Sequence, residues 1–346
     1  MNRRDFLDLR TLVPAVGPLV GAVEPEAEAS LGPPVHLRYG RRAMATFFEV
    51  ILPLGTPDAQ SLAMSALDVV DRLETQLTVF HETSEVSRLN RRAVRCPIPA
   101  EAGLFHLLCL AKRLHAETDG AFDIAVGALV KTWGFFRRQG RVPSQAELTA
   151  VRERIGMQHV RLDIERQTVL FERQGLEINL GSIGKGYALD RTAALLRPTV
   201  RQALLHGGHS SILALGDEAP GKSGWAIGLL DPEQPSCRRA VIRLRDRGMA
   251  TSAITYQHFT HDDRKLGHLL DPRTAWPAEG ILSATATAPT AAEADALATA
   301  FFILGAEGSR TYCASHPEVG AVLITADQPS RLQVMGHSVY EMLAEG

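Results

Sequence analysis

The amino-acid sequence predicts a globular protein in which helices and short strands are mixed. Apolar residues recur every three or four positions in segments 57–77 and 102–117, which is the spacing of amphipathic helices. Two short apolar runs around a charged turn predict a β-hairpin over 157–172. The chain has 346 residues, 45% of them hydrophobic and 22% charged, which suits one large domain or two ordinary ones.

The other elements follow along the chain. A helix is expected after the glycine loop 181–186, ending near Leu196, and a last helix over 291–304. Thr290 and Glu293 have the spacing of a capping box at the start of that last helix, and Gly305 is placed to end it. Strands are expected at 46–52, 176–180, 202–206, 225–230, 240–244, 281–288 and 321–325.

The bulk composition excludes several classes of function. The formal net charge of −2 gives no support for binding to nucleic acid or to an anionic membrane surface. The four cysteines are far apart and form no metal or redox motif, so a disulfide framework is not indicated. No run of about eighteen apolar residues follows the leader, so no membrane span is predicted.

The first thirty residues differ from the rest of the chain. Their paired arginines before a bulky apolar residue resemble a twin-arginine export signal, although Pro14 and Pro18 interrupt the apolar run that follows. We therefore expect 1–30 to be an export leader and the protein to be periplasmic or exported. A disordered basic leader on a cytoplasmic protein is the alternative. No cysteine precedes Cys96, so no lipid anchor is expected.

The glycine loop 181–186 suggests a phosphate contact. A glycine loop that opens a helix brings backbone N–H groups to an anion, and Lys185 stands inside the loop. The loop is not a Walker A motif, because Asn179 stands where the first glycine belongs and Gly186 follows the lysine. It is not a dinucleotide motif either, because Ile183 breaks that spacing. An ordinary glycine turn with a solvated lysine is the alternative.

Three carboxylates lie in apolar or turn surroundings. Asp295 and Thr299 are four residues apart on one face of a nearly apolar helix, which offers two oxygen donors of the kind that Mg²⁺ prefers. A solvent-facing, inert pair is the alternative. Asp123 among apolar residues either faces water at a turn or is held by a donor. His268 and Asp271 could serve as an acid–base pair, although a histidine at a strand end more often has a structural role.

Six separated motifs in order resemble one family, the ApbE family of FAD:protein FMN transferases. The resemblance covers about residues 40–325. The motifs are Met44-Ala-Thr46; Phe80 with Ser84-Glu-Val-Ser-Arg-Leu-Asn90; Gly120-Ala-Phe-Asp123 with Val126-Gly and Trp133-Gly-Phe; Asn179-Leu-Gly-Ser-Ile-Gly-Lys185-Gly-Tyr-Ala-Leu-Asp190; Ala250-Thr-Ser252; and His268-Leu-Leu-Asp271-Pro-Arg-Thr with Ala294-Asp-Ala-Leu-Ala-Thr299.

The resemblance implies an α+β fold of the T-fold-like type, with antiparallel sheets packed against helices in one flavin transferase domain over 35–345. It also implies an enzyme that binds FAD and Mg²⁺. Such an enzyme cleaves the FAD diphosphate, attaches FMN through a phosphoester to a threonine or serine hydroxyl of a target protein, and releases AMP. The targets are typically subunits of membrane redox complexes.

The resemblance also implies roles for individual residues. Metal ligands fall on the backbone carbonyl of Gly184 and on the side chains of Asp295 and Thr299, and the residues with catalytic roles are Lys185, Asp295 and His268. The residues expected to contact the flavin nucleotide are Met44, Phe80, Ala121, Phe122, Asp123, Lys185, Thr251, Ser252 and Ile254.

The chain departs from the family pattern at several positions. The family usually has glycine where Ala45, Ala253 and Ala275 stand, aspartate where Asn179 stands, and alanine where Gly184 stands. These departures bear on rate and acceptor preference. Two alternatives to the transferase stay open: a Mg²⁺-dependent FAD pyrophosphatase that gives FMN and AMP, with water in place of the acceptor hydroxyl, and an exported FAD-binding protein without turnover, which the departures make possible. A serine hydrolase is disfavoured, because no base accompanies Ser252.

Overall fold

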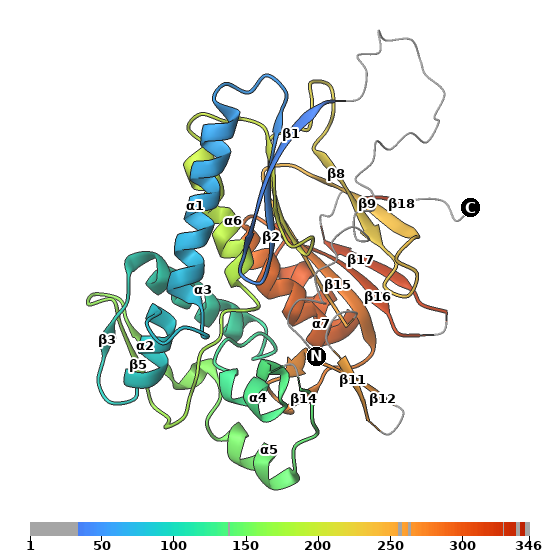
Figure 1. Cartoon of the computed structure of the whole chain (residues 1–346). Coiled ribbons are helices and arrows are strands. Elements are labelled where there is room, and N and C mark those ends of the chain that lie inside the picture. The colour runs from blue at the N-terminus through green and yellow to red at the C-terminus, as the bar shows by residue number, and fades with distance from the viewer. Residues whose placement is uncertain are drawn as a thin grey trace, which may run out of the picture.

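An eight-stranded antiparallel sheet forms the centre of the molecule (Figure 1). The computed structural model describes residues 34–342 except 138, 255–257, 262–263, 328 and 337–339. The expected leader, 1–30, lies outside the described residues. In spatial order the strands are β1 (His36–Ala43), β2 (Thr46–Pro53), β6 (Ala203–Gly207), β7 (Ser211–Leu215), β10 (Gly248–Ala253), β15 (Ile281–Ala288), β16 (Gly320–Thr325) and β17 (Leu332–Gly336).

Three helices pack side by side on one face of this sheet: α1 (Ala59–Leu77), α6 (Gly184–Leu196) and α7 (Ala291–Ser315) (Figure 1). Their apolar sides and the sheet enclose the main core. The helix expected from residue 57 begins at Ala59 instead, because Asp58 has a left-handed backbone (φ 50°) at the N-cap position. Every residue of α7 before Gly305 is buried or half-buried, as its sequence predicts.

A smaller antiparallel sheet covers part of the opposite face. Its strands are β8 (Trp225–Leu230), β9 (Arg238–Leu244) and β18 (Tyr340–Met342), in the order β18-β9-β8. Trp225 and Ile242 of this sheet share a second apolar cluster with Ile51 and Ile212 of the large sheet. Alternate residues of the large sheet therefore enter two different cores, one under the helices and one under the smaller sheet.

The segment between α1 and α6 forms a helical region with its own small sheet. Its helices are α2 (Glu85–Arg92), α3 (Ala102–Glu117), α4 (Gly127–Thr132) and α5 (Gln145–Arg152), and its sheet has the order β3 (Ile98–Pro99), β5 (Thr168–Phe171), β4 (Val160–Asp163). The predicted hairpin over 157–172 is confirmed as β4 and β5. Two short ladders follow β10: β11 (His258–His261) with β12 (Arg264–Gly267), and β13 (Leu270–Asp271) with β14 (Trp276–Pro277).

The strand expected at 176–180 is wrong. The backbone of Ile178 is bonded to the side chain of Asn90, which accepts its N–H and donates to its carbonyl, both at 2.9 Å. The N–H of Asn179 donates to the carbonyl of Ile124 at 2.7 Å. These isolated bonds satisfy the segment without a strand partner. They also fix the approach to the glycine loop.

The last helix continues beyond its expected end. Gly305 has a non-helical conformation (φ 69°), so the chain breaks there as predicted, but a second helical stretch follows to Ser315. Thr290 accepts the N–H of Glu293 at 3.1 Å, which confirms the N-cap. The carboxylate of Glu293 accepts from the Thr290 hydroxyl and pairs with Arg113. These partners occupy it in place of the predicted bond to the Thr290 backbone.

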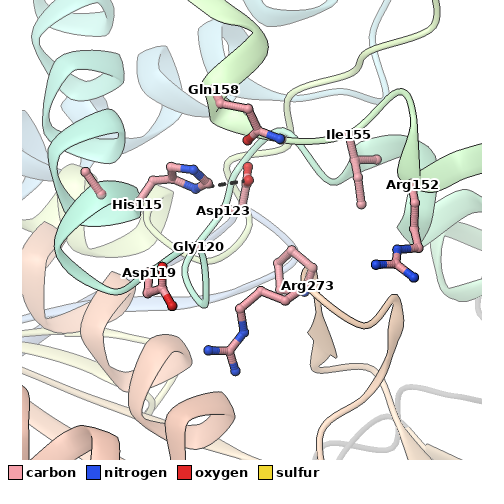
Figure 2. A pocket seen from close by; sticks show the side chains of 11 residues that line it. His115, Asp119, Gly120, Asp123, Arg152, Ile155, Gln158 and Arg273 are labelled. Carbon is pink, nitrogen blue, oxygen red and sulfur yellow. Dashed lines mark ion pairs between the residues drawn. The ribbon is translucent and has the colours of Figure 1, made fainter.

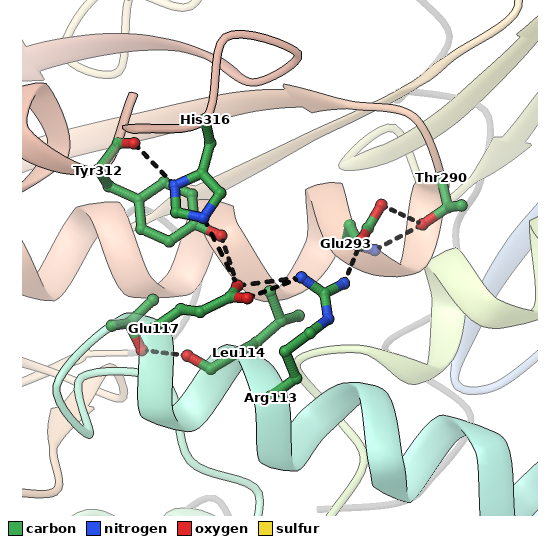
Figure 3. A network of polar contacts seen from close by, with 8 residues as sticks. Arg113, Leu114, Glu117, Thr290, Glu293, Tyr312 and His316 are labelled. Carbon is green, nitrogen blue, oxygen red and sulfur yellow. Dashed lines mark hydrogen bonds and ion pairs between the residues drawn. The ribbon is translucent and has the colours of Figure 1, made fainter. Parts of the chain in front are cut away.

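A polar network joins α3 to both parts of α7 (Figure 3). Arg113 lies 2.5 Å from a Glu293 oxygen and 3.0 Å from a Glu117 oxygen. Glu117 also accepts from the Tyr312 hydroxyl at 3.1 Å. Because Glu293 precedes Gly305 and Tyr312 follows it, the network holds α7 on both sides of its break.

The α+β fold with antiparallel sheets packed against helices is thus confirmed. Within the part of the chain that the structure describes, no helix combines the length and the apolar character needed to cross a membrane.

Candidate active site

The first turns of α6 and α7 meet over strands β7 and β10, and Asp295 stands between them. Asp295 is only 5% exposed. Its Oδ2 accepts the N–H of Gly186 at 2.7 Å, and its Oδ1 accepts from the Ser211 hydroxyl at 2.5 Å. The ammonium of Lys185 lies 3.8 Å from Oδ2, which is longer than a hydrogen bond. The solvent-facing alternative for Asp295 is therefore wrong.

Further hydroxyl groups lie near the main chain of Asp295. The Thr299 hydroxyl is 3.4 Å from the Asp295 carbonyl and 3.2 Å from the Ser252 hydroxyl. The sequence prediction did not include Ser211, which reaches Asp295 only because β7 pairs with β10. One carboxylate and three hydroxyls from α7, β7 and β10 thus lie within one polar cluster next to Lys185.

This donor set suits a hard cation. Among the residues that the structure describes, no group of three or more His, Cys, Asp or Glu side chains could hold a metal ion. A Zn²⁺-type cluster or an all-carboxylate Ca²⁺ cage is therefore not formed by the described part of the chain. Mg²⁺ commonly takes one or two carboxylates and completes its shell with water and substrate phosphates. Asp295, with Thr299 nearby, fits that pattern.

The glycine loop supports the same cluster. Gly184 is the first residue of α6, and its N–H donates to the Leu180 carbonyl at 2.7 Å. Asn179, which stands where the family usually has aspartate, accepts the N–H of Gly181 at 2.9 Å and so closes the loop. Gly184 stands two residues before Gly186, whose N–H donates to Asp295, so the loop and the carboxylate are directly connected.

Exposed aromatic rings lie in the helical region. Phe80 is 69% exposed and stacks on Phe136, with ring centroids 4.9 Å apart. The Lys131 ammonium lies 5.2 Å from the centre of the Phe136 ring. His268 meets Phe135 edge to face at 6.4 Å. Phe80 thus has a ring surface available to a planar ligand.

Asp123 lies at an open cavity of about 400 Å³ (Figure 2). It is 6% exposed and accepts the N–H of Ala125 at 2.6 Å and that of Met157 at 3.0 Å. The His115 Nδ1 lies 3.1 Å from Asp123 Oδ2. Arg273 also lines the cavity, but Lys185, Asp295 and Thr299 do not. Asp123 is therefore held by donors, and the residues that line this cavity are not those of the oxygen cluster.

The other expected flavin contacts occupy varied settings. Ala121 and Phe122 are 1% and 0% exposed. Thr251 and Ser252 are adjacent on β10: the Thr251 hydroxyl contacts that of Thr285 at 2.8 Å, whereas Ser252 contacts Thr299. Because neighbouring residues of a strand point to opposite faces, only Ser252 joins the cluster at Asp295. Met44 and Ile254 are half-buried.

Two of the residues that depart from the family pattern have a left-handed backbone. Ala45 has φ 59° and Ala275 has φ 63°, a region that favours glycine. Ala275 is fully buried, and its carbonyl accepts from the Trp133 indole at 2.9 Å. Ala253 lies in β10 without a positive φ. Asp271, four residues before Ala275, accepts a hydrogen bond from the Arg273 guanidinium at 2.8 Å.

Comparisons with known proteins identify relatives of this chain. The model of the ApbE family matches residues 44–323. The FAD:protein FMN transferase of Treponema pallidum is 30% identical over 277 residues, which is 76% of each chain. The FAD:protein FMN transferase of Escherichia coli K12 is 28% identical over 279 residues, which is 78% of each chain.

Solved structures show the same fold. The ApbE protein from Thermotoga maritima superimposes with a TM-score of 0.79 at 26% identity, over 87% of this chain and 97% of that one. The flavinyl transferase ApbE from Pseudomonas stutzeri gives a TM-score of 0.75 at 25% identity, over 90% of this chain and 96% of that one.

Proposed function

Because the chain belongs to the ApbE family, we propose that it is a Mg²⁺-dependent FAD:protein FMN transferase. The observation that carries the proposal is the buried Asp295, which has neutral donors in contact and the Lys185 ammonium at 3.8 Å. A buried carboxylate that makes no hydrogen bond to a cation favours the binding of one.

In this proposal the Gly184 carbonyl, Asp295 and Thr299 would hold Mg²⁺, and the ion would supply charge neutralisation for the FAD diphosphate. Lys185 binds the same diphosphate. Phe80 stacks against the isoalloxazine ring, because its ring face is exposed. The remaining nucleotide contacts are those implied by the family: Met44, Ala121, Phe122, Asp123, Thr251, Ser252 and Ile254.

The proposed reaction is a phosphoryl substitution. A threonine or serine hydroxyl oxygen of the acceptor protein forms a bond to the phosphorus on the FMN side of FAD. The bond between that phosphorus and the bridging oxygen breaks, and AMP leaves with the electron pair. The hydroxyl proton passes to a base, for which His268 is the candidate. FMN remains on the acceptor through a phosphoester.

The leader and the acceptor belong to the same proposal. An export leader at 1–30 would place the enzyme in the periplasm, where the exported domains of membrane redox-complex subunits would be its acceptors. N-terminal sequencing of protein from the native host tests this placement. A mature chain that starts after residue 30 supports it, and an intact leader on soluble cytoplasmic protein contradicts it.

A single assay tests the activity. The protein is incubated with FAD, Mg²⁺ and a candidate acceptor domain, and AMP, free FMN and flavin bound covalently to the acceptor are measured. AMP together with flavin on the acceptor supports the transferase. AMP with free FMN points to the pyrophosphatase, because water then replaces the acceptor hydroxyl. FAD that is bound but stays intact would exclude both enzymes.

A further inference from the structure

The helices α6 and α7 cap each other. Asp295 of α7 accepts the N–H of Gly186, in the first turn of α6. Asp190 of α6 accepts the N–H groups of Ala291 and Ala292, the first two residues of α7, at 2.8 and 2.9 Å. Asp190 lies four residues after Gly186 in α6, and Asp295 lies four residues after Ala291 in α7. Each aspartate is therefore about one helical turn away from the residue that the other aspartate binds.

The two helices are also in backbone contact at this point. A Cβ atom placed on Gly186 would lie 2.0 Å from the carbonyl oxygen of Ala291. The first turn of α7 therefore rests directly on the first turn of α6. Two aspartates and one glycine fix the separation and the register of the two turns.

We propose that Asp190 is a positioning residue for the metal site, a role that rests on the proposed function. Asp295 can reach both a cation and the Gly184–Gly186 turn only if the first turn of α7 keeps its place on α6. Asp190 supplies two of the hydrogen bonds that keep it there, although it belongs to neither the metal ligands nor the flavin contacts. Losing them lets Asp295 move relative to the Gly184 carbonyl.

A purely structural role for Asp190 predicts something different. In that case, removing any N-cap hydrogen bond of α7 would lower the Mn²⁺ affinity in proportion to the fall in melting temperature. Thr290 provides the matched comparison, because its side chain caps the same turn through Glu293 and makes none of the hydrogen bonds between α6 and α7 described above. Removing the Thr290 hydroxyl weakens the helix start and leaves the α6–α7 connection intact.

The test measures Mn²⁺ binding to the full chain by the electron paramagnetic resonance signal of free Mn²⁺. Asp190→Ala is expected to weaken Mn²⁺ binding about 10- to 100-fold, as loss of a group that orients a metal ligand typically does. Asp190→Asn keeps one acceptor oxygen and should fall between wild type and Asp190→Ala. Thr290→Ala should bind Mn²⁺ as the wild type does. Melting temperatures are recorded for all four proteins.

The outcomes separate the two proposals. If wild type binds Mn²⁺ and both Asp190 variants bind it equally well, the positioning role is wrong and the metal site stands. If Thr290→Ala loses as much affinity as Asp190→Asn for the same fall in melting temperature, Asp190 is only a structural cap. If the wild type binds no Mn²⁺, the proposed metal site is wrong, and so is the positioning role of Asp190. Should Asp190→Ala not fold, Asp190→Asn decides the matter.

Discussion

Asp123 and Asp295 are two buried carboxylates with nearly equal exposure, 6% and 5%, and with different partners. Asp123 is touched by two backbone N–H groups and by the imidazole of His115. Asp295 is touched by one N–H and one hydroxyl, and its cation, Lys185, stays at 3.8 Å. The first carboxylate has an imidazole within hydrogen-bond distance, whereas the ammonium nearest to the second lies beyond hydrogen-bond distance.

The difference separates a carboxylate that links two segments from one that can accept a metal ion. Two N–H groups from different segments make Asp123 a link between its own loop and residue 157, and the His115 imidazole lies 3.1 Å from it. Asp295 has oxygen lone pairs left and a neighbourhood of hydroxyls. An added cation would therefore improve the electrostatic energy at Asp295 more than at Asp123. The following predictions test this comparison, from the largest expected effect to the smallest.

Asp295→Ala should abolish Mg²⁺-dependent turnover, because it removes the only carboxylate of the proposed ligand set. A loss of several kcal/mol of transition-state stabilisation corresponds to about 10³-fold or more in kcat/KM. The measurement is AMP release from FAD at saturating Mg²⁺, with circular dichroism as the control for folding. Full activity in this variant would remove the metal site proposed above.

Asp123→Ala should act on stability instead. It leaves the N–H groups of Ala125 and Met157 without their acceptor and His115 without its partner. Breaking such a buried network costs about 3 kcal/mol in the free energy of unfolding. Urea unfolding measures this cost. The folded fraction should bind Mn²⁺ as the wild type does, and a loss of Mn²⁺ affinity would show that the two carboxylates are not separate in role.

The pH dependence of the free energy of unfolding should show the contribution of Asp190. Burial raises the pKa of Asp190 from 3.8 to about 6, against the effect of its two N–H bonds, and the charges of Asp295 and Glu293 add to the rise. Because the folded pKa is the higher one, the stabilisation is complete below pH 3.8 and is lost as the pH rises through 6. The change is about 3 kcal/mol for the metal-free protein.

Comparison with Asp190→Asn isolates this contribution. The free energy of unfolding of wild type, minus that of the variant, should fall between pH 4 and pH 7 in urea titrations without metal. Added Mg²⁺ should reduce the fall, because a nearby cation favours the charged carboxylate. A difference that is flat or rises with pH would contradict the raised pKa.

The sequence predicts best where the pattern is local. The periodicity of residues 102–117 and the hairpin over 157–172 arise from neighbouring residues, and both are present in the structure. Residues 176–180 look equally apolar, but their partners are Asn90 and Ile124, which no local pattern connects to them. Long-range hydrogen bonds there override the strand signal.

The candidate site shows the same limit. Asp295 and Thr299 could be paired from their helical spacing alone, and the structure brings Lys185 to Asp295 as expected. Ser211 could not be found, because its contact depends on the pairing of β7 with β10. Asp190 stood in a recognised motif, yet its role is visible only when α6 and α7 are seen together.

The smallest expected effect concerns His115, the charge partner of Asp123. Burial lowers the pKa of His115, but the hydrogen bond and the charge of Asp123 outweigh burial, so the net shift is upward from 6.5. A raised folded pKa means that the pair contributes fully below pH 6.5 and that this contribution is lost as the pH rises through the folded value. His115→Gln, which stays neutral, should remove this dependence. Melting temperatures at pH 5.5 and pH 8 measure it: wild type should lose more than His115→Gln on going to the higher pH. Equal losses would mean that folding leaves the pKa of His115 unshifted, so that the contact with Asp123 does not favour the charged imidazole and does not distinguish Asp123 from Asp295.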